Sequence, residues 1–166
     1  MHFWWVTIVL LLPTLVIAYS KQCSYEQYRI IKECSDNVTS KYRPGSSLTT
    51  VFKICNQGRR CFEKIHCQGS IEANNVLQAG CEYQYFLQTT FKTCLDIINE
   101  KTNCLQAMPP NYTNDLEAPH CAIFKSIYHC VIPAIREHCE SEILVDTFKE
   151  KYLAHNGMSY DCEPFE

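Results

Sequence analysis

Twelve cysteines behind an export-type segment constrain this 166-residue chain more than any other feature of its sequence. They are Cys23, Cys34, Cys55, Cys61, Cys67, Cys81, Cys94, Cys104, Cys121, Cys130, Cys139 and Cys162. Disulfides form and persist in oxidising compartments. Because the number of cysteines is even, the simplest interpretation is six bridges without a free thiol, in a connectivity that the spacing leaves open.

The export segment occupies residues 1–20. Its apolar run, residues 3–17, is about 15 residues long, which is short of the roughly 20 that a spanning helix needs. It ends in Ala18-Tyr19-Ser20, a small-x-small pattern typical of signal-peptide cleavage, and Lys21 follows. We therefore predict a signal peptide over residues 1–20, one domain over residues 21–166, and a secreted, extracellular protein with no membrane span after cleavage. The alternative is an uncleaved signal anchor.

Helical periodicity and few glycines indicate the fold class. The chain has five glycines, under half the usual share of about 7%, and tight hairpin turns depend on glycine. Apolar residues recur at helical spacing in most segments between the cysteines. The sequence predicts an all-α, compact, disulfide-stapled domain of about five to seven short helices.

The expected elements follow from this spacing and from Pro and Gly positions. We expect helices over residues 23–34, 49–67, 81–100 and 120–139, and a last helix from Ser141 that ends at Asn156-Gly157. Gly58 is expected to divide the second of these, and Pro133 to kink or restart the fourth. Residues 68–80 are ambiguous, and residues 35–47 and 106–119 are predicted loops.

The first two cysteines illustrate what the spacing excludes. Cys23 and Cys34 lie on one face of the first predicted helix, about 16 Å apart along its axis. That distance is too long for a disulfide. Each cysteine must therefore bond to another segment.

The chain lacks recognisable catalytic or metal-binding spacing. There is no C-x-x-C pair for a redox dithiol, no short C-x(2–4)-C pair for zinc, and no G-x-S-x-G. Four histidines precede cysteines directly: His66, His120, His129 and His138. His120, His129 and His138 are nine residues apart, which turns successive side chains to opposite faces of a continuous helix, and oxidised cysteines offer no thiolate. We expect no catalytic residue, no metal and no cofactor.

Two N-glycosylation sequons occur, Asn37-Val38-Thr39 and Asn111-Tyr112-Thr113. About one is expected by chance in a chain of this composition. Both fall in segments predicted as loops. We therefore predict glycosylation at Asn37 and Asn111, with unused sequons as the alternative.

The order of these residues resembles a known family. The runs FKICNQGRRCFEKIHC (52–67), CEYQYFLQTTFKTC (81–94) and CAIFKSIYHCVIPAIREHC (121–139), with Cys104, TFKEKYL (147–153) and Cys162, resemble a nematode-expanded secreted cysteine-rich domain family. That family is domain of unknown function nineteen. The resemblance covers nearly the whole chain after the signal peptide. It implies a secreted, helical, disulfide-bonded domain without an established activity or catalytic residue.

Two function classes remain open after these exclusions. A net charge of −3 without a basic block argues against a nucleic-acid partner. We expect a secreted interaction module that binds an extracellular protein, a glycan or another surface component, and that is not an enzyme. The alternative is a carrier of a small apolar ligand, such as a lipid, in a cavity between helices.

Overall fold

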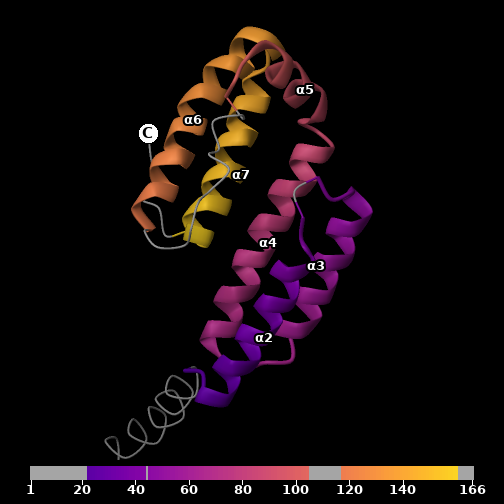
Figure 1. Cartoon of the computed structure of the whole chain (residues 1–166), viewed down its shortest axis with the longest axis vertical. Coiled ribbons are helices and arrows are strands. Elements are labelled where there is room, and N and C mark those ends of the chain that lie inside the picture. The colour runs from indigo at the N-terminus through magenta and orange to yellow at the C-terminus, as the bar shows by residue number, and fades with distance from the viewer. Residues whose placement is uncertain (1–21, 44, 105–116, 161–166) are drawn as a thin grey trace, which may run out of the picture. The chain divides into compact units, whose positions relative to one another are not determined.

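The computed structural model describes residues 22–43, 45–104 and 117–160. Six helices form the regular structure of these residues: α2 (Tyr25–Lys41), α3 (Leu48–Phe62), α4 (Gln68–Gln88), α5 (Lys92–Lys101), α6 (Glu117–Cys139) and α7 (Glu142–Tyr160) (Figure 1). The all-α prediction is confirmed. The predicted signal peptide and most of the predicted 106–119 loop lie outside the described residues.

Helix α2 begins at a capping box and is longer than the sequence predicted. The backbone N–H of Ser24 donates to Gln27 Oε1 (2.8 Å), and the Gln27 N–H donates back to Ser24 Oγ (3.2 Å). The helix continues through residues 35–41, so the loop predicted over 35–47 begins only at the C-cap, Tyr42. These polar residues remain helical because their exposed positions need no apolar contact, and Lys32 and Asp36 form an i, i+4 ion pair.

Helix α3 runs through Gly58 without a break, so the expected division there is wrong. A Cβ at this position would lie 2.5 Å from Leu77 Cδ2 of α4 and 2.7 Å from Val38 Cγ2 of α2. Glycine at this position therefore allows three helices to pack closely against one another. It is not a helix stop here.

The helix predicted over residues 81–100 is divided between α4 and α5. Residues 89–91 form a turn, in which the N–H of Phe91 donates to the carbonyl of Phe86 (2.9 Å). The turn stacks the rings of these two residues, with centroids 5.1 Å apart. Burial of both rings compensates for the interrupted helix. The ambiguous residues 68–80 form the first part of α4.

Helices α6 and α7 run side by side and are joined by a short turn (Figure 1). Pro133 lies inside α6 and does not start a new helix. Ser141 begins α7 as predicted, because its Oγ accepts from the Leu144 N–H (3.3 Å). The predicted stop at Asn156-Gly157 is wrong. Asn156 is 1% exposed and its amide donates to the carbonyl of Tyr152 (2.9 Å), inside the continuing helix.

The described chain divides into two compact units. The first contains residues 22–46 and 52–77, and the second contains residues 47–51 and those from 78 onward. Each unit has its own buried cluster. The prediction of one domain over residues 21–166 stays a prediction.

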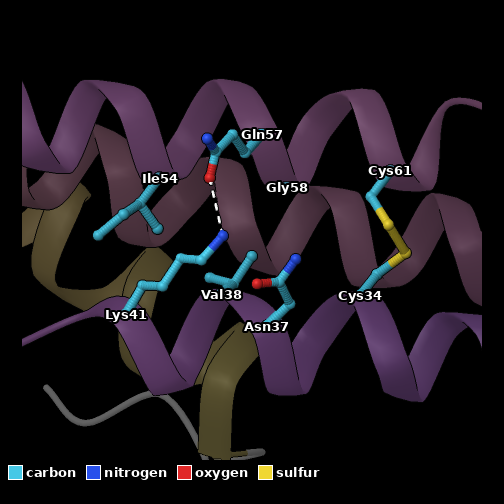
Figure 2. Close-up of a pocket in the computed structure, with 8 residues that line it drawn as sticks. All are labelled: Cys34, Asn37, Val38, Lys41, Ile54, Gln57, Gly58 and Cys61. Atoms are coloured by element: carbon cyan, nitrogen blue, oxygen red, sulfur yellow. Dashed lines mark hydrogen bonds between the residues drawn. A yellow bond between two sulfur atoms is a disulfide. The ribbon is translucent and has the colours of Figure 1, made fainter.

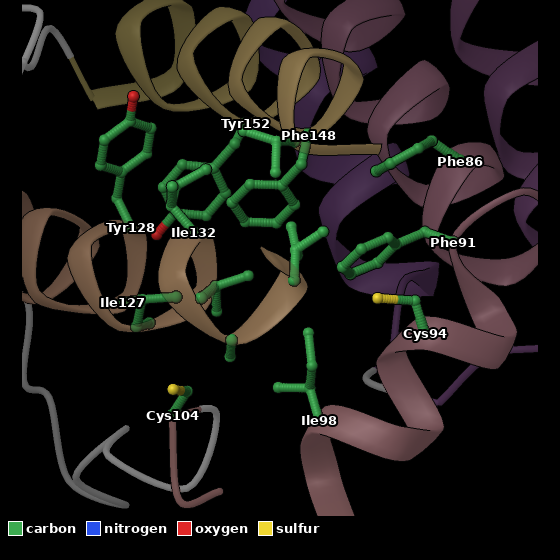
Figure 3. Close-up of a cluster of buried hydrophobic side chains, with 14 residues drawn as sticks. Phe86, Phe91, Cys94, Ile98, Cys104, Ile127, Tyr128, Ile132, Phe148 and Tyr152 are labelled. Atoms are coloured by element: carbon green, nitrogen blue, oxygen red, sulfur yellow. The ribbon is translucent and has the colours of Figure 1, made fainter. Parts of the chain in front are cut away.

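The two units have cores of different size. In the second, the buried cluster has fourteen side chains, among them Phe91, Ile98, Phe148 and Tyr152 (Figure 3). In the first, the buried cluster is Cys34, Phe62, Ile65 and Cys67, so two of its four members are half-cystines. A core this small is the kind that depends on covalent links for stability.

Candidate functional site

The disulfides determine which side chains are held rigidly. The pairs are Cys23–Cys67, Cys34–Cys61, Cys94–Cys139 and Cys104–Cys130, with Cα–Cα distances of 5.0, 5.9, 5.6 and 5.5 Å. Cys55, Cys81 and Cys121 are also disulfide-bonded, and no described cysteine is free. Cys162 lies outside the described residues. Cys23 and Cys34 each bond to another segment, as their separation required.

Oxidation removes the described cysteines from thiolate chemistry. A disulfide sulfur is neither a nucleophile nor a ligand of the kind zinc sites use. Among the described residues, no group of three His, Cys, Asp or Glu side chains is placed to hold a metal ion.

The histidines that precede cysteines lie at separate places. His66 is exposed between α3 and α4, and His129 is exposed on α6, edge-on to Tyr128 (ring centroids 5.5 Å apart). His138 is half-buried in the last turn of α6. The side chain of His120 lies outside the described part of the structure.

Sequence reasoning missed His155, which the structure places in a distinctive environment. Its ring stacks on Tyr83 of α4 (centroids 5.2 Å apart, 21° between planes), opposite Gly80. Burial lowers the pKa of His155, because desolvation penalises the charged imidazolium. The sequence could have indicated this burial, because His155 lies seven residues after Phe148 and therefore on the same face of α7.

The first sequon lies in a helix and not in the expected loop. Asn37 is exposed on α2. The hydroxyl of Thr39 donates to the carbonyl oxygens of Ser35 and Asp36 (3.0 and 3.2 Å). Glycosylation at Asn37 stays a prediction, and Asn111 lies outside the described residues.

A small hollow lies between α2 and α3 (Figure 2). It is lined by Cys34, Asn37, Val38, Lys41, Ile54, Gln57, Gly58 and Cys61. Its volume is about 10 Å³, which is about the minimum for one water molecule. Ligand cavities measure several hundred Å³, so this hollow cannot hold a small apolar ligand.

One cation, Lys41, lines this hollow, and two more lie on the same helix face as Gln57. Lys41 Nζ donates to Gln57 Oε1 across the two helices (3.1 Å; Figure 2). Lys53 and Arg60 stand four residues before and three residues after Gln57 on α3 and are both exposed. Positions at these spacings are neighbours on a helix surface. We call Lys41, Lys53, Arg60 and Gln57 the α2–α3 cation cluster.

Charge is distributed unevenly along the chain. Residues 22–77 contain eight Lys or Arg and five Asp or Glu, whereas residues 78–166 contain six and thirteen. This division is not visible in the net charge of the whole chain, which is only −3, or in contiguous basic runs, because the basic residues are scattered. The charge of each segment, counted separately, would have revealed it.

Two tyrosines are exposed at the beginning of α2. Tyr25 is 86% exposed and Tyr28 is 54% exposed. Tyr28 lies beside the Cys23–Cys67 bridge, because a Cβ at Gly69 would be 3.2 Å from its ring and 3.0 Å from Cys23 Sγ. The bridge therefore restrains the position of this part of α2.

No helix in the described part of the chain is long and apolar enough to cross a membrane. No curated protein and no solved structure gives a significant match to the sequence. A family model described as "Domain of unknown function (DUF19)" matches residues 17–163, a range that includes both structural units. The chain therefore belongs to the DUF19 family, as its cysteine order and flanking aromatic residues indicated.

Proposed function

We propose that this protein is an extracellular binding module and not an enzyme. One observation carries the proposal: disulfides hold exposed aromatic and cationic side chains of α2 and α3 on a rigid frame. Cys23–Cys67 restrains the start of α2, and Cys34–Cys61 joins its middle to the end of α3. A backbone that is restrained before binding loses less entropy when a partner arrives.

The exposed residue types also favour recognition. Tyrosine and arginine are enriched among the residues that dominate binding energies at protein interfaces. Tyr25 and Tyr28 offer large ring surfaces from one helix. The described cysteines, which would be the strongest nucleophiles of the chain, are committed to bridges.

The disulfides also support the extracellular location. A chain with no free cysteine among its described residues requires an oxidising compartment for folding. We expect protein recovered from the extracellular medium to begin at Lys21, within about two residues. Recovery of an intact Met1 terminus on membranes would contradict secretion.

Native mass spectrometry of the protein purified from its own source tests the binding function. We expect the wild-type protein to retain a partner or ligand, and the Tyr25→Ser/Tyr28→Ser variant to have lost it. The matched control is Ile143→Ser, which removes an apolar side chain that is 79% exposed on α7 and should leave the complex intact.

An activity screen tests the second half of the proposal. Folded protein should show no hydrolase or oxidoreductase turnover. Reproducible turnover that disappears in a folded variant of His66, His120, His129, His138 or His155 would establish an enzyme and overturn the proposal.

A further inference from the structure

The α2–α3 cation cluster belongs to the basic side chains of its unit that form no ion pair; among the described residues, Arg43 and Lys64 also form none. Arg29 pairs with Glu26, Lys32 with Asp36 (2.6 Å), and Arg59 with Glu63 (3.5 Å). Among the described residues, no carboxylate forms an ion pair with Lys41, Lys53 or Arg60. Their charges therefore remain available to an external anion.

The backbone that carries the cluster is held in place by the surrounding fold. Lys41 is held across the helix pair by its hydrogen bond to Gln57. Arg60 is the residue directly before Cys61, whose bridge to Cys34 joins α3 to α2. Lys53 and Arg60 are separated by about 10 Å along the axis of α3, at a rise of 1.5 Å per residue. Lys53 and Arg60 thus lie on the same face of α3 as Gln57, over about two helical turns, and Lys41 reaches that face from α2.

We propose that the α2–α3 cation cluster binds an anionic polysaccharide that carries sulfate groups. This inference rests on the binding function proposed above and names the ligand class for one surface. Arg60 can donate two parallel hydrogen bonds to a sulfate, and the two lysines contribute point charges. The amide nitrogen of Gln57 has donors that suit sugar hydroxyls.

A polysaccharide fits these observations better than the other common polyanions. The disulfides indicate an oxidising compartment, where sulfated glycans are the abundant anionic chains. Lys53 and Arg60 are separated by only about 10 Å along the axis of α3, an extent that suits a thin chain better than a broad anionic surface such as a bilayer. A thin chain can lie on the cluster alone.

Fluorescence anisotropy of a labelled heparin dodecasaccharide tests the proposal with the mature, oxidised protein. The test variant is Lys41→Gln/Lys53→Gln/Arg60→Gln. The control is Lys92→Gln/Lys101→Gln/Lys125→Gln, which removes equal charge from exposed positions on α5 and α6. Circular dichroism and thermal melting establish that both variants are folded.

We expect the wild type to bind and the dissociation constant to rise with salt. The test variant should raise the dissociation constant by at least about tenfold and reduce the log–log salt slope by about two. The control variant should stay within about threefold of the wild type. No binding by the wild type, or equal losses in both variants, would overturn the proposal.

Two competitors separate sulfate recognition from simple charge attraction. A de-sulfated dodecasaccharide should compete poorly, and so should a single-stranded oligonucleotide of equal charge. Equal competition by either one overturns the assignment to sulfated glycan. If the wild type retains a partner in native mass spectrometry but does not bind the dodecasaccharide, the binding function stands and the glycan site is wrong.

Discussion

At the scale of single residues, Gly58 of α3 and Gly80 of α4 have opposite surroundings. Gly58 lies where Val38 and Leu77 leave no room for a Cβ, whereas a Cβ at Gly80 would be 3.5 Å from the His155 ring, an ordinary contact. Both are helical. The effect of an added methyl group is therefore decided by neighbours that are distant in sequence.

We predict that Gly58→Ala lowers the free energy of unfolding by about 1–3 kcal/mol, because Val38 is stiff at χ1 and cannot move aside freely. Gly80→Ala should raise it by about 0.5–1 kcal/mol, since alanine loses less backbone entropy in a helix. Urea denaturation of both variants checks the pair. Equal effects of the same sign would contradict the packing at Gly58.

His155 gives the stability a dependence on pH. Burial lowers its pKa in the folded state, so below the ordinary value of about 6.5 the unfolded chain binds more protons. The neutral, buried His155 ring therefore leaves the free energy of unfolding at its full value above about pH 6.5. That free energy falls as the pH drops from there toward the lowered pKa of the folded state. The Lys151–Glu82 ion pair (2.9 Å) also links α7 to α4, so other charges act close to this contact.

Thermal melting between pH 7.5 and 5 should show a falling midpoint. His155→Gln should reduce that fall, because glutamine does not titrate. His66→Gln, at an exposed position, is the control and should leave the dependence unchanged. An identical pH dependence in wild type and His155→Gln would show that other groups cause it.

At the scale of elements, the interruption between α4 and α5 is the main departure from the periodic pattern. The turn at residues 89–91 buries Phe91 completely, with 0% exposure, and sets its ring 5.4 Å from that of Phe148 on α7. Helical spacing of apolar residues predicted a single helix over residues 81–100 with its apolar side chains toward the core. It did not show that two helices present them.

We predict that Phe91→Ala lowers the free energy of unfolding by about 3–5 kcal/mol, the usual cost of removing a buried phenylalanine. Ile143→Ala removes an apolar side chain that is 79% exposed and should change stability by less than about 0.5 kcal/mol. Chemical denaturation monitored by circular dichroism checks both. A cost below that of Ile143→Ala would place Phe91 outside the core.

At the scale of the whole molecule, the bridges compensate for the small core of the first unit. Only four residues form its buried cluster, against fourteen in the second unit. A typical disulfide contributes about 2–4 kcal/mol, mainly by restricting the unfolded chain. We therefore expect the first unit to depend on oxidation more strongly than the second.

Reduction should lower the melting temperature by tens of degrees, with the loss concentrated in residues 22–77. Hydrogen exchange measured by mass spectrometry should show early exchange in α2 and α3 and later exchange in α5 to α7. The deglycosylated oxidised chain should weigh about 12 Da less than its reduced form, one hydrogen per cysteine. Two or more free thiols, or an unchanged melt after reduction, would contradict this account.

The sequence by itself determined the helical class, the oxidation of the described cysteines and the family. These depend on local periodicity, residue composition and residue order, which need no knowledge of long-range contacts. It also placed the helix start at Ser141. The boundaries that failed are those where a distant segment overrides local preference.

Only the tertiary structure decided the remainder. Local sequence predicts that Gly58 and Asn156 interrupt helices. In the structure, Gly58 allows helices to pack closely, and Asn156 is buried within α7. The α2–α3 cation cluster joins Lys41 to residues more than ten positions away, and His155 acquires its environment from Tyr83. Packing between segments creates these arrangements, and the free energy of burial outweighs the local propensities from which the sequence predictions were made.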